Sequence, residues 1–189
     1  MTTLTKKNIE SRLKSILSER IMILDGAMGT MIQQHHLTEK DYRGNQFSKF
    51  SAPDGERELF LKGNNELLSI TKPKIIQDIH EEFLEAGADI IETNTFGANS
   101  IAQDDYYMPH LVHEMNLASV NIAKKAVSNY SSPEKPRFIA GAIGPTPKTA
   151  SISPDVNDPG ARNINFDELV KSYREQTKAL IEGGVDIIL

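Results

Sequence analysis

Apolar residues recur at helical spacing in four segments of the chain. In the first segment, Ile9, Leu13 and Ile16 lie three or four positions apart, as they would on one face of a helix. The same spacing returns in three segments further along. Helices are therefore predicted over residues 5–19, 71–86, 111–127 and 165–182.

Short, continuous apolar runs follow the predicted helices and indicate strands. They are too short for helices, and several are bounded by glycine or proline. Runs that are apolar throughout are typical of parallel strands, because helices cover such sheets. The predicted strands are residues 21–24, 88–95, 138–143 and 185–189, so the last of them ends at Leu189.

Residues that begin and end helices support this assignment. Thr71 is expected to cap the second helix, and Pro73 is tolerated in its first turn, where no helical N–H partner is needed. Asn165 with Glu168 three residues later forms a capping-box pattern at the last helix. Gly87 follows the second helix and is expected to end it in a left-handed conformation.

The alternation of strand and helix predicts an α/β fold with a parallel sheet. A TIM-type (β/α)8 barrel needs eight strands and about 250 residues, so four strands cannot close one. We therefore expect residues 1–20 to form an N-terminal helix and residues 21–189 to form the first half of such a barrel. The open edges of a half barrel predict self-association.

Two segments share the pattern Glu-x-Gly-x-Asp-Ile-Ile, at residues 85–91 and 182–188. The glycine is suited to end a helix, and the apolar pair is suited to enter the sheet. This end of a barrel strand usually serves stability. We interpret the repeat as structural.

Ligands of parallel α/β folds bind at the carboxyl ends of the strands, and polar or small residues occupy three such ends. Asp25 and Gly26 follow the first predicted strand and are suited to an ammonium group and an anion; an Asp-Gly pair is equally a common turn. Residues 93–96 lie at the end of the second strand and either orient a polar ligand, cap the next helix or pin the loop. Gly144 follows the third and either admits a ligand or permits close packing. The candidate site residues are Asp25, Gly26, Thr93, Asn94, Thr95, Phe96 and Gly144.

Composition narrows the classes of function. The 21 basic and 26 acidic residues give a formal charge of −5, which argues against a nucleic-acid-binding surface. No apolar run is long enough to span a membrane, and no signal peptide is evident, so a cytoplasmic location is expected. The sequence has no cysteine, and its histidines lack a recognisable metal-ligand spacing. No phosphate-binding loop, dinucleotide fingerprint or serine-hydrolase elbow is present.

Three motifs in order resemble the homocysteine S-methyltransferase family. They are Leu-Asp-Gly-Ala-Met-Gly-Thr at 24–30, Ala-Gly-Ala-Asp-Ile-Ile-Glu-Thr-Asn-Thr-Phe at 86–96 and Ala-Gly-Ala-Ile-Gly-Pro-Thr at 140–146. Residues 148–160 are particularly similar to the cobalamin-dependent methionine synthase branch. The resemblance covers about residues 20–189.

The resemblance implies a barrel that transfers a methyl group from methylcobalamin to zinc-activated homocysteine, forming methionine, with methyltetrahydrofolate recharging the cobalamin in further modules. Asp25 would bind the homocysteine ammonium and the backbone at Gly26 its carboxylate, while residues 93–95 would line the pocket. An acidic residue assisting with the amino group is expected just past the fourth strand.

One departure limits what this chain does alone. The family's zinc is held by three cysteines on later strands; this chain has none, and the resemblance places them beyond Leu189. We therefore expect no bound cofactor and no catalysis from the 189 residues alone. Two other functions stay open: a cobalamin-independent homocysteine methyltransferase using betaine or S-methylmethionine, and a phosphate-binding barrel lyase or isomerase.

Overall fold

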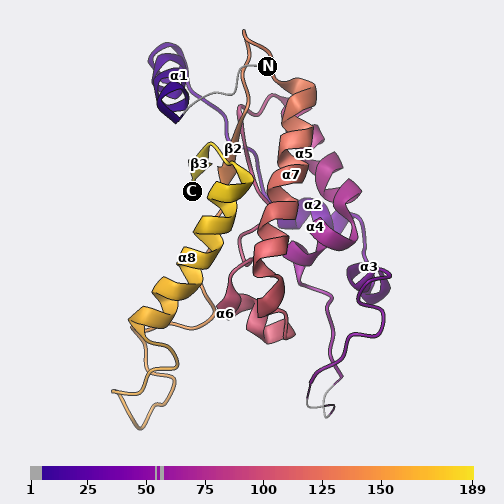
Figure 1. Cartoon of the computed structure of the whole chain (residues 1–189), viewed down its shortest axis with the longest axis vertical. Coiled ribbons are helices and arrows are strands. Elements are labelled where there is room, and N and C mark those ends of the chain that lie inside the picture. The colour runs from indigo at the N-terminus through magenta and orange to yellow at the C-terminus, as the bar shows by residue number, and fades with distance from the viewer. Residues whose placement is uncertain (1–5, 54, 56–57) are drawn as a thin grey trace.

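The fold is built on a three-stranded parallel sheet in the order β1–β2–β3 (Figure 1). In the computed structural model, which describes residues 6–53, 55 and 58–189, Ile91 lies opposite Ile139 and Gly141 lies opposite Ile188. The α/β class with parallel strands is confirmed. The strands are β1 (Ile90–Glu92), β2 (Phe138–Gly141) and β3 (Ile187–Ile188).

The prediction of a first strand at residues 21–24 is wrong. Leu24 makes one isolated parallel bridge to Ile90, and the Asp25 N–H donates to the Ile90 carbonyl at 2.9 Å. The segment has a paired neighbour on one side only, and Ile21 is 81% exposed. The Ile23 carbonyl also accepts the N–H groups of Asp89 and Ile90, but no regular strand forms at 21–24, and the described residues contain three strands instead of four.

The strand predicted over residues 185–189 is shorter than expected, and Leu189 lies outside it. The Val185 N–H donates to the Leu180 carbonyl, so this residue still belongs to the turn after the last helix. Leu189 is about half exposed, yet its N–H donates to the Gly141 carbonyl at 3.0 Å and its own carbonyl accepts the Ile143 N–H at 2.9 Å. The backbone at Leu189 therefore continues along β2, although the regular strand β3 covers two residues only.

All four predicted helices are present, and shorter helices lie between them. The capping box of Asn165 and Glu168 is formed as expected, and Gly87 ends its helix at φ 114°. The α-helices are α1 (Lys6–Glu19), α2 (Met28–Gln34), α3 (Glu39–Arg43), α4 (Leu68–Thr71), α5 (Pro73–Ala86), α6 (Ser100–Gln103), α7 (Val112–Tyr130) and α8 (Phe166–Gly183). Short 3₁₀ turns occupy η1 (Asn65–Leu67), η2 (Asp104–Tyr106) and η3 (Pro109–Leu111).

Thr71 does not cap α5, contrary to expectation. It ends the separate helix α4, and its hydroxyl donates to the Leu67 carbonyl one turn earlier. Lys72 takes the N-cap position of α5 and provides no side-chain hydrogen bond there. Pro73 is the first residue of α5, as its fixed φ predicts.

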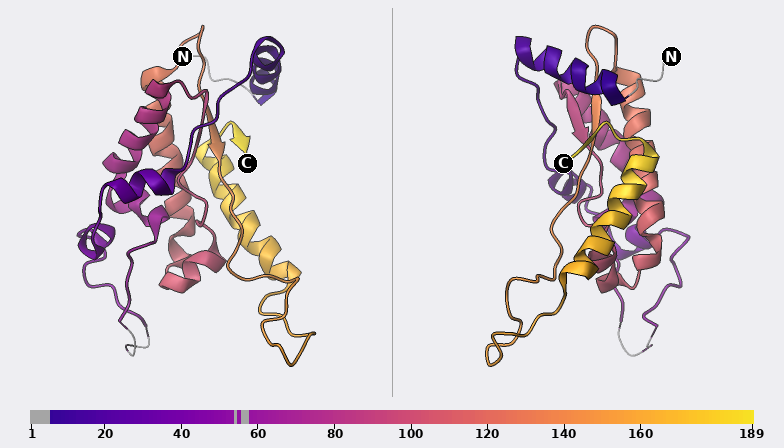
Figure 2. Two further views of the ribbon diagram at one scale, coloured as in Figure 1. Left: turned by 180° about the vertical axis from the view of Figure 1, so that it is seen from behind. Right: turned by 60° about the vertical axis from the view of Figure 1, so that its left-hand side comes forward.

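Helices α5, α7 and α8 lie side by side along one face of the sheet (Figures 1 and 2), with α7 in contact with both of the others. Leu84, Ile91 and Ala123 belong to the apolar cluster between the helices and the sheet. A larger cluster joins α2, α4, α5 and α7. Side chains buried between these layers hold the helices against the sheet and against one another.

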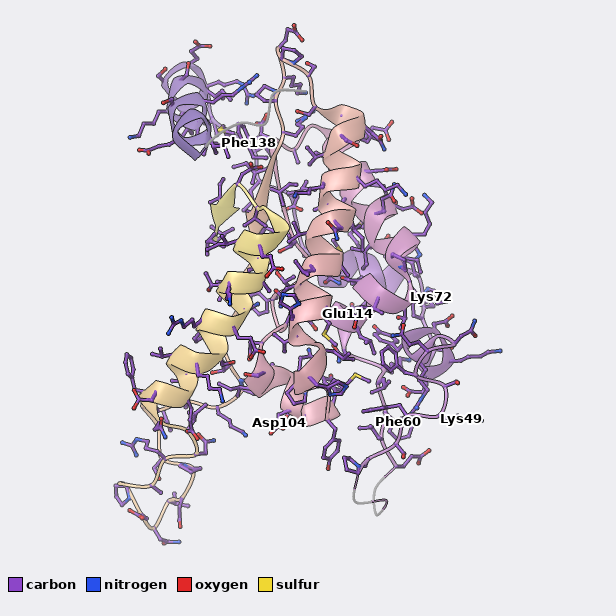
Figure 3. The ribbon with its side chains drawn as sticks, in the orientation of Figure 1. Lys49, Phe60, Lys72, Asp104, Glu114 and Phe138 are labelled. Atoms are coloured by element: carbon purple, nitrogen blue, oxygen red, sulfur yellow. The ribbon has the colours of Figure 1, made fainter. Side chains whose placement is uncertain are left out.

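The ion pair between Glu39 and Arg43 fixes part of the irregular segment before α5. Glu39 accepts hydrogen bonds from the backbone of Leu61 and Lys62, while Arg43 donates to Glu39 and to the Leu59 carbonyl. This segment reaches the end of the molecule where Lys49 and Phe60 lie, opposite Phe138 at the start of β2 (Figure 3). A stretch with little secondary structure thus holds a defined course.

Asp89 and Asp186, the aspartates of the repeated Glu-x-Gly-x-Asp-Ile-Ile pattern, make equivalent hydrogen bonds. Asp89 Oδ2 accepts the Ile23 N–H and Asp186 Oδ2 accepts the Ile139 N–H, both at 2.9 Å. Each aspartate therefore accepts a hydrogen bond from a neighbouring segment: Asp89 from the segment at 21–24, and Asp186 from β2. The structural interpretation of the repeat agrees with these contacts.

Among the described residues, no helix is long and apolar enough to cross a membrane.

Candidate functional site

A cavity of about 490 Å³ opens at the carboxyl ends of the strands. Its walls come from the turn after the edge segment, from the 3₁₀ turn before α4, and from the ends of β1 and β2. The lining residues are 25–29, 65–66, 92–96 and 142. Six of the seven candidate residues lie here; Gly144 does not.

Asp25 places one fixed and one free carboxylate oxygen at this cavity. Oδ2 accepts a hydrogen bond from the Glu92 N–H at 3.0 Å, while Oδ1 is buried and has no partner among the described residues. Burial raises the pKa of Asp25 to about 7, with a further contribution from the charge of Glu92. A buried acceptor without a donor is costly, so a ligand N–H would remove a penalty.

At Gly26 the backbone lies so close to α5 that there is little room for a side chain. A Cβ at this position would lie 3.0 Å from the ring of Phe83, which belongs to α5. The backbone after Asp25 therefore passes against α5 without a side chain in between. Its peptide groups remain at the cavity wall, where the expected contact with a ligand carboxylate would form.

Side chains of residues 93–95 make hydrogen bonds within the protein. The Thr93 and Thr95 hydroxyls lie 2.6 Å apart, and Thr95 also donates to the Ala142 carbonyl at 2.8 Å. Asn94 Nδ2 donates to the Asn65 carbonyl, and the Asn94 N–H donates to Ser119 Oγ. The threonine contacts join the ends of β1 and β2, and the Asn94 contacts join the end of β1 to η1 and α7. A direct role in binding substrate stays a prediction for these residues.

Phe96 lies at the mouth of the cavity and is 59% exposed. Its carbonyl accepts the Gly144 N–H at 3.0 Å, and a Cβ on Gly144 would lie 2.5 Å from that same oxygen. On the other side, the Gly97 N–H donates to Glu66 Oε1 at 2.8 Å. Gly144 thus acts on the site by letting Phe96 approach, in keeping with the close-packing alternative.

Two carboxylates at the cavity escaped the sequence analysis. Glu92 ends an otherwise apolar strand, and that charged position was its available signal. Glu66 comes from the 3₁₀ turn before α4, and only the tertiary fold brings it to residue 97. Burial raises the pKa of both side chains.

The cavity carries acidic groups without a basic residue. Asp25, Glu66 and Glu92 line it, and no lysine, arginine or histidine is among the described lining residues. Uncompensated carboxylates favour a ligand that brings positive charge. The polar end of such a ligand is therefore expected beside Asp25.

The described residues do not form a metal-binding site. The sequence has no cysteine, and the described residues contain no group of three or more histidine, aspartate or glutamate side chains placed to hold a metal. The donor set for a thiophilic metal is not present in these residues, so no chemical step is derived through one. The zinc cysteines expected beyond Leu189 fall outside this sequence, and their place stays a prediction.

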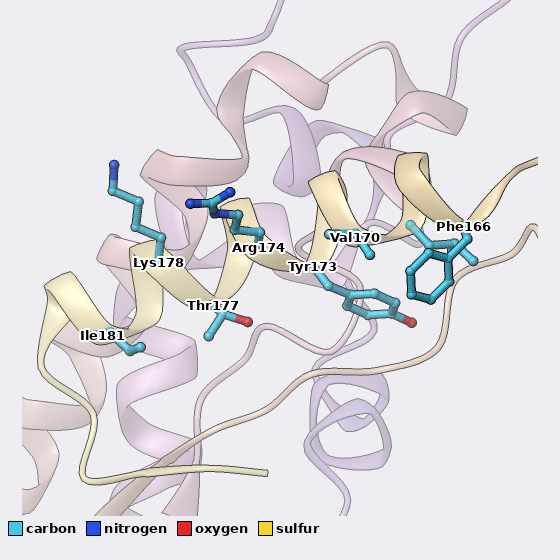
Figure 4. Close-up of a pocket in the computed structure, with 8 residues that line it drawn as sticks. Phe166, Val170, Tyr173, Arg174, Thr177, Lys178 and Ile181 are labelled. Carbon is cyan, nitrogen blue, oxygen red and sulfur yellow. The ribbon is translucent and has the colours of Figure 1, made fainter.

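A second hollow, of about 740 Å³, lies along α8 (Figure 4). All of its lining residues, including Phe166, Tyr173 and Ile181, belong to that one helix. A hollow made by one helix cannot surround a ligand, and it lies away from Asp25. We interpret it as a packing face.

Comparison with known proteins identifies the fold and the family. The homocysteine S-methyltransferase family model matches residues 22–189. Structures of the homocysteine methyltransferase MmuM from Escherichia coli are similar in fold. The oxidized form is 18% identical with a TM-score of 0.66, covering 93% of this chain and 55% of that chain. The metallated form is 19% identical with a TM-score of 0.65 and the same coverage. The apo form is 20% identical with a TM-score of 0.57, covering 93% and 51%.

This chain therefore spans about half the length of those solved structures.

Proposed function

The chain belongs to the homocysteine S-methyltransferase family, and we propose that it forms the homocysteine-binding part of a methyltransferase that produces methionine. In this proposal, residues 21–189 are the first half of a (β/α)8 barrel, and residues 1–20 precede it. Within a complete barrel, the Asp25 cavity holds the amino-acid end of homocysteine.

The observation that carries the proposal is the free oxygen of Asp25. Oδ1 is buried without a partner among the described residues, and the lining residues supply no cation to satisfy it. A homocysteine ammonium group supplies both a hydrogen-bond donor and a positive charge. The neighbouring backbone at Gly26 then faces the substrate carboxylate, where no side chain intervenes.

The chain's own residues contribute binding and orientation. Asp25 fixes the ammonium group, and the hydrogen-bonded Thr93–Thr95 pair holds the cavity wall in place. Phe96 covers part of the mouth, so a substrate beneath it loses contact with water. Together these contacts hold the amino-acid end of homocysteine in the cavity.

The metal belongs to the complete enzyme in this proposal. One of the related structures is a metallated form, and the family resemblance points to zinc held by cysteines beyond Leu189. When bound, zinc favours the thiolate of homocysteine, which is the better nucleophile. Because the present residues lack such ligands, zinc is assigned to the parent protein and not to this chain.

We favour methylcobalamin as the methyl donor, with methyltetrahydrofolate recharging it in separate modules. Support comes from the sequence of residues 148–160, which resembles the cobalamin-dependent branch. A donor such as betaine or S-methylmethionine is the alternative within the family. The lyase or isomerase alternative loses its support, because the family model covers residues 22–189.

We also propose two further properties of this chain, the first of which is self-association. The open edge of β3 and the exposed apolar side chains of α8 favour self-association of this chain. The second is a cytoplasmic location.

The test compares homocysteine binding by the protein and its Asp25→Asn variant in titration calorimetry. We expect affinity to fall by about 1.5–3 kcal/mol, because a charge-assisted hydrogen bond is lost. Asp105→Asn, an exposed position, is the matched control and should leave affinity unchanged. Equal affinity of the wild type and Asp25→Asn would remove Asp25 from the site. Turnover of the complete protein with each donor then decides between methylcobalamin, betaine and S-methylmethionine.

A further inference from the structure

Glu92 brings a second carboxylate to the cavity beside Asp25. Its N–H donates to Asp25 Oδ2 at 3.0 Å, and both residues line the same cavity. Within β1, Ile91 is fully buried against the helices, whereas Ile90 and Glu92 are only partly buried. Because side chains alternate along a strand, Glu92 lies on the face of β1 that turns away from the helices.

Among the described residues, no positively charged side chain pairs with the carboxylate of Asp25 or Glu92. Asp25 Oδ1 is without a partner, and the Glu92 carboxylate makes no hydrogen bond or ion pair with any described residue. Glu66, the third acidic lining residue, is occupied by the Gly97 N–H. Burial raises the pKa of Asp25 and of Glu92, and the charge of Glu92 raises that of Asp25 further. A bound cation removes this mutual repulsion.

We propose that Glu92 is a specificity-determining residue, which together with Asp25 selects substrates that carry a protonated amino group. The inference rests on the proposed function and adds the basis of substrate choice. Asp25 Oδ1 accepts a proton of the ammonium group, and Glu92 provides the second negative charge facing it. The ligand class is therefore an α-amino acid with a free ammonium group.

An analogue with a hydroxyl in place of the ammonium group should be rejected. It leaves two carboxylates without a positive charge, and sites built around a polar partner discriminate strongly against analogues that lack it. The hydroxy analogue of homocysteine, 2-hydroxy-4-mercaptobutanoate, has the same chain and the same thiol. The ratio of the two affinities therefore isolates the contribution of the amino group.

The experiment measures both affinities by titration calorimetry in the full-length protein and in its Glu92→Gln variant. We expect homocysteine to bind about tenfold more weakly to Glu92→Gln, while the hydroxy analogue binds equally well or better. Glu82→Gln makes the same chemical change on the exposed side of α5 and should alter neither affinity. Glu92→Asp keeps the charge and should retain most of the selectivity.

Each other outcome is informative. If Glu92→Gln weakens both ligands equally, Glu92 supports the wall of the site and the inference is overturned. An unchanged ratio of affinities overturns it as well. If Glu92→Gln does not fold, Glu92→Asp decides. Because this variant keeps the negative charge, loss of its preference for homocysteine over the hydroxy analogue would count against the proposal. Failure of the wild type to bind homocysteine rejects the proposed function itself, which is a separate result.

Discussion

The Arg20 guanidinium donates two hydrogen bonds of 2.7 Å to the carboxylate of Asp89. Asp89 is almost completely buried, and Nη1 of the buried Arg137 lies 3.7 Å from Asp89 Oδ1. The hydrogen bonds from Arg20 are the main cause that lowers the pKa of Asp89. This ion cluster joins the chain after α1 to the start of β1.

Asp89→Asn is predicted to destabilise the protein by about 3 kcal/mol, because it leaves the charge of Arg137 buried with backbone carbonyls as its hydrogen-bond partners but without a counter-ion among the described residues. The stabilisation is present above about pH 4 and is lost in more acidic solution as Asp89 is protonated. Asp186→Asn is the matched control, since Asp186 accepts a backbone N–H but forms no ion pair among the described residues. It should cost about 1 kcal/mol. Urea unfolding at neutral pH measures both, and equal losses would reject the role of the cluster.

Homocysteine affinity is predicted to rise with pH between about 5.5 and about 7.5. The ammonium group binds the ionised form of Asp25, and the pKa of this carboxyl is raised to about 7. Binding in the lower part of this range must therefore displace a proton. Calorimetry in buffers with different ionisation enthalpies detects that release. A constant affinity across the range would show that Asp25 is already ionised.

His80 is predicted to make the fold sensitive to acid. It is fully buried on α5, neither ring nitrogen has a partner among the described residues, and burial lowers its pKa to about 4. The unfolded chain binds a proton near pH 6.5 that the folded chain excludes, so stability falls as the pH drops from about 6.5 to about 4, by about 3 kcal/mol in total. Burial of Asp25 acts in the opposite direction over the same range, since its raised pKa favours the protonated folded form.

A variant separates the two effects. His80→Leu removes the buried ring nitrogens and should raise the stability at pH 5 by more than at pH 7. His110→Leu, at an exposed position, is the control for the general effect of losing a histidine. Thermal unfolding at both pH values provides the measurement. An equal shift at the two pH values would mean that His80 does not titrate on unfolding.

Self-association is predicted to depend on the apolar face of α8. Val170 and Ile181 are partly exposed on this helix, although they are large and apolar. Ile181→Glu places a charge on the face and should lower the apparent mass of this chain in light scattering. Val156→Glu introduces the same charge into an exposed loop position and should have no effect. A chain that is monomeric from the start would contradict the prediction.

Periodicity was sufficient to predict the four long helices but not the short helices α2, α3, α4 and α6, because burial of one face dominates the formation of a long helix. The helix from Pro73 to Ala86 follows its apolar spacing, and Asn165 caps α8 through a local four-residue pattern. Residues 21–24 show the limit of such reasoning. Their apolar character is that of a strand, but strand formation depends on neighbours that sequence spacing does not reveal.

Part of the site could be predicted from the sequence, because the order of the strands determines where their ends lie. Asp25 and residues 93–96 lie at the carboxyl ends of predicted strands, so parallel topology alone places them near one another. Glu66 was not accessible, because it arrives from an irregular segment whose path is set by the Glu39–Arg43 pair. Gly144 was placed at the correct end of the sheet, yet its contact is with Phe96 and not with the cavity.

The aspartates that accept N–H groups from the neighbouring segment also bear on how strand pairing stays correct during folding. A shift of one residue between Ile23 and Asp89, or between Ile139 and Asp186, would separate a carboxylate from the backbone N–H that it accepts. Short apolar strands discriminate poorly between alignments by hydrophobic contact alone. In this protein, misaligned pairings are penalised electrostatically, by one acidic side chain at each of these two crossings.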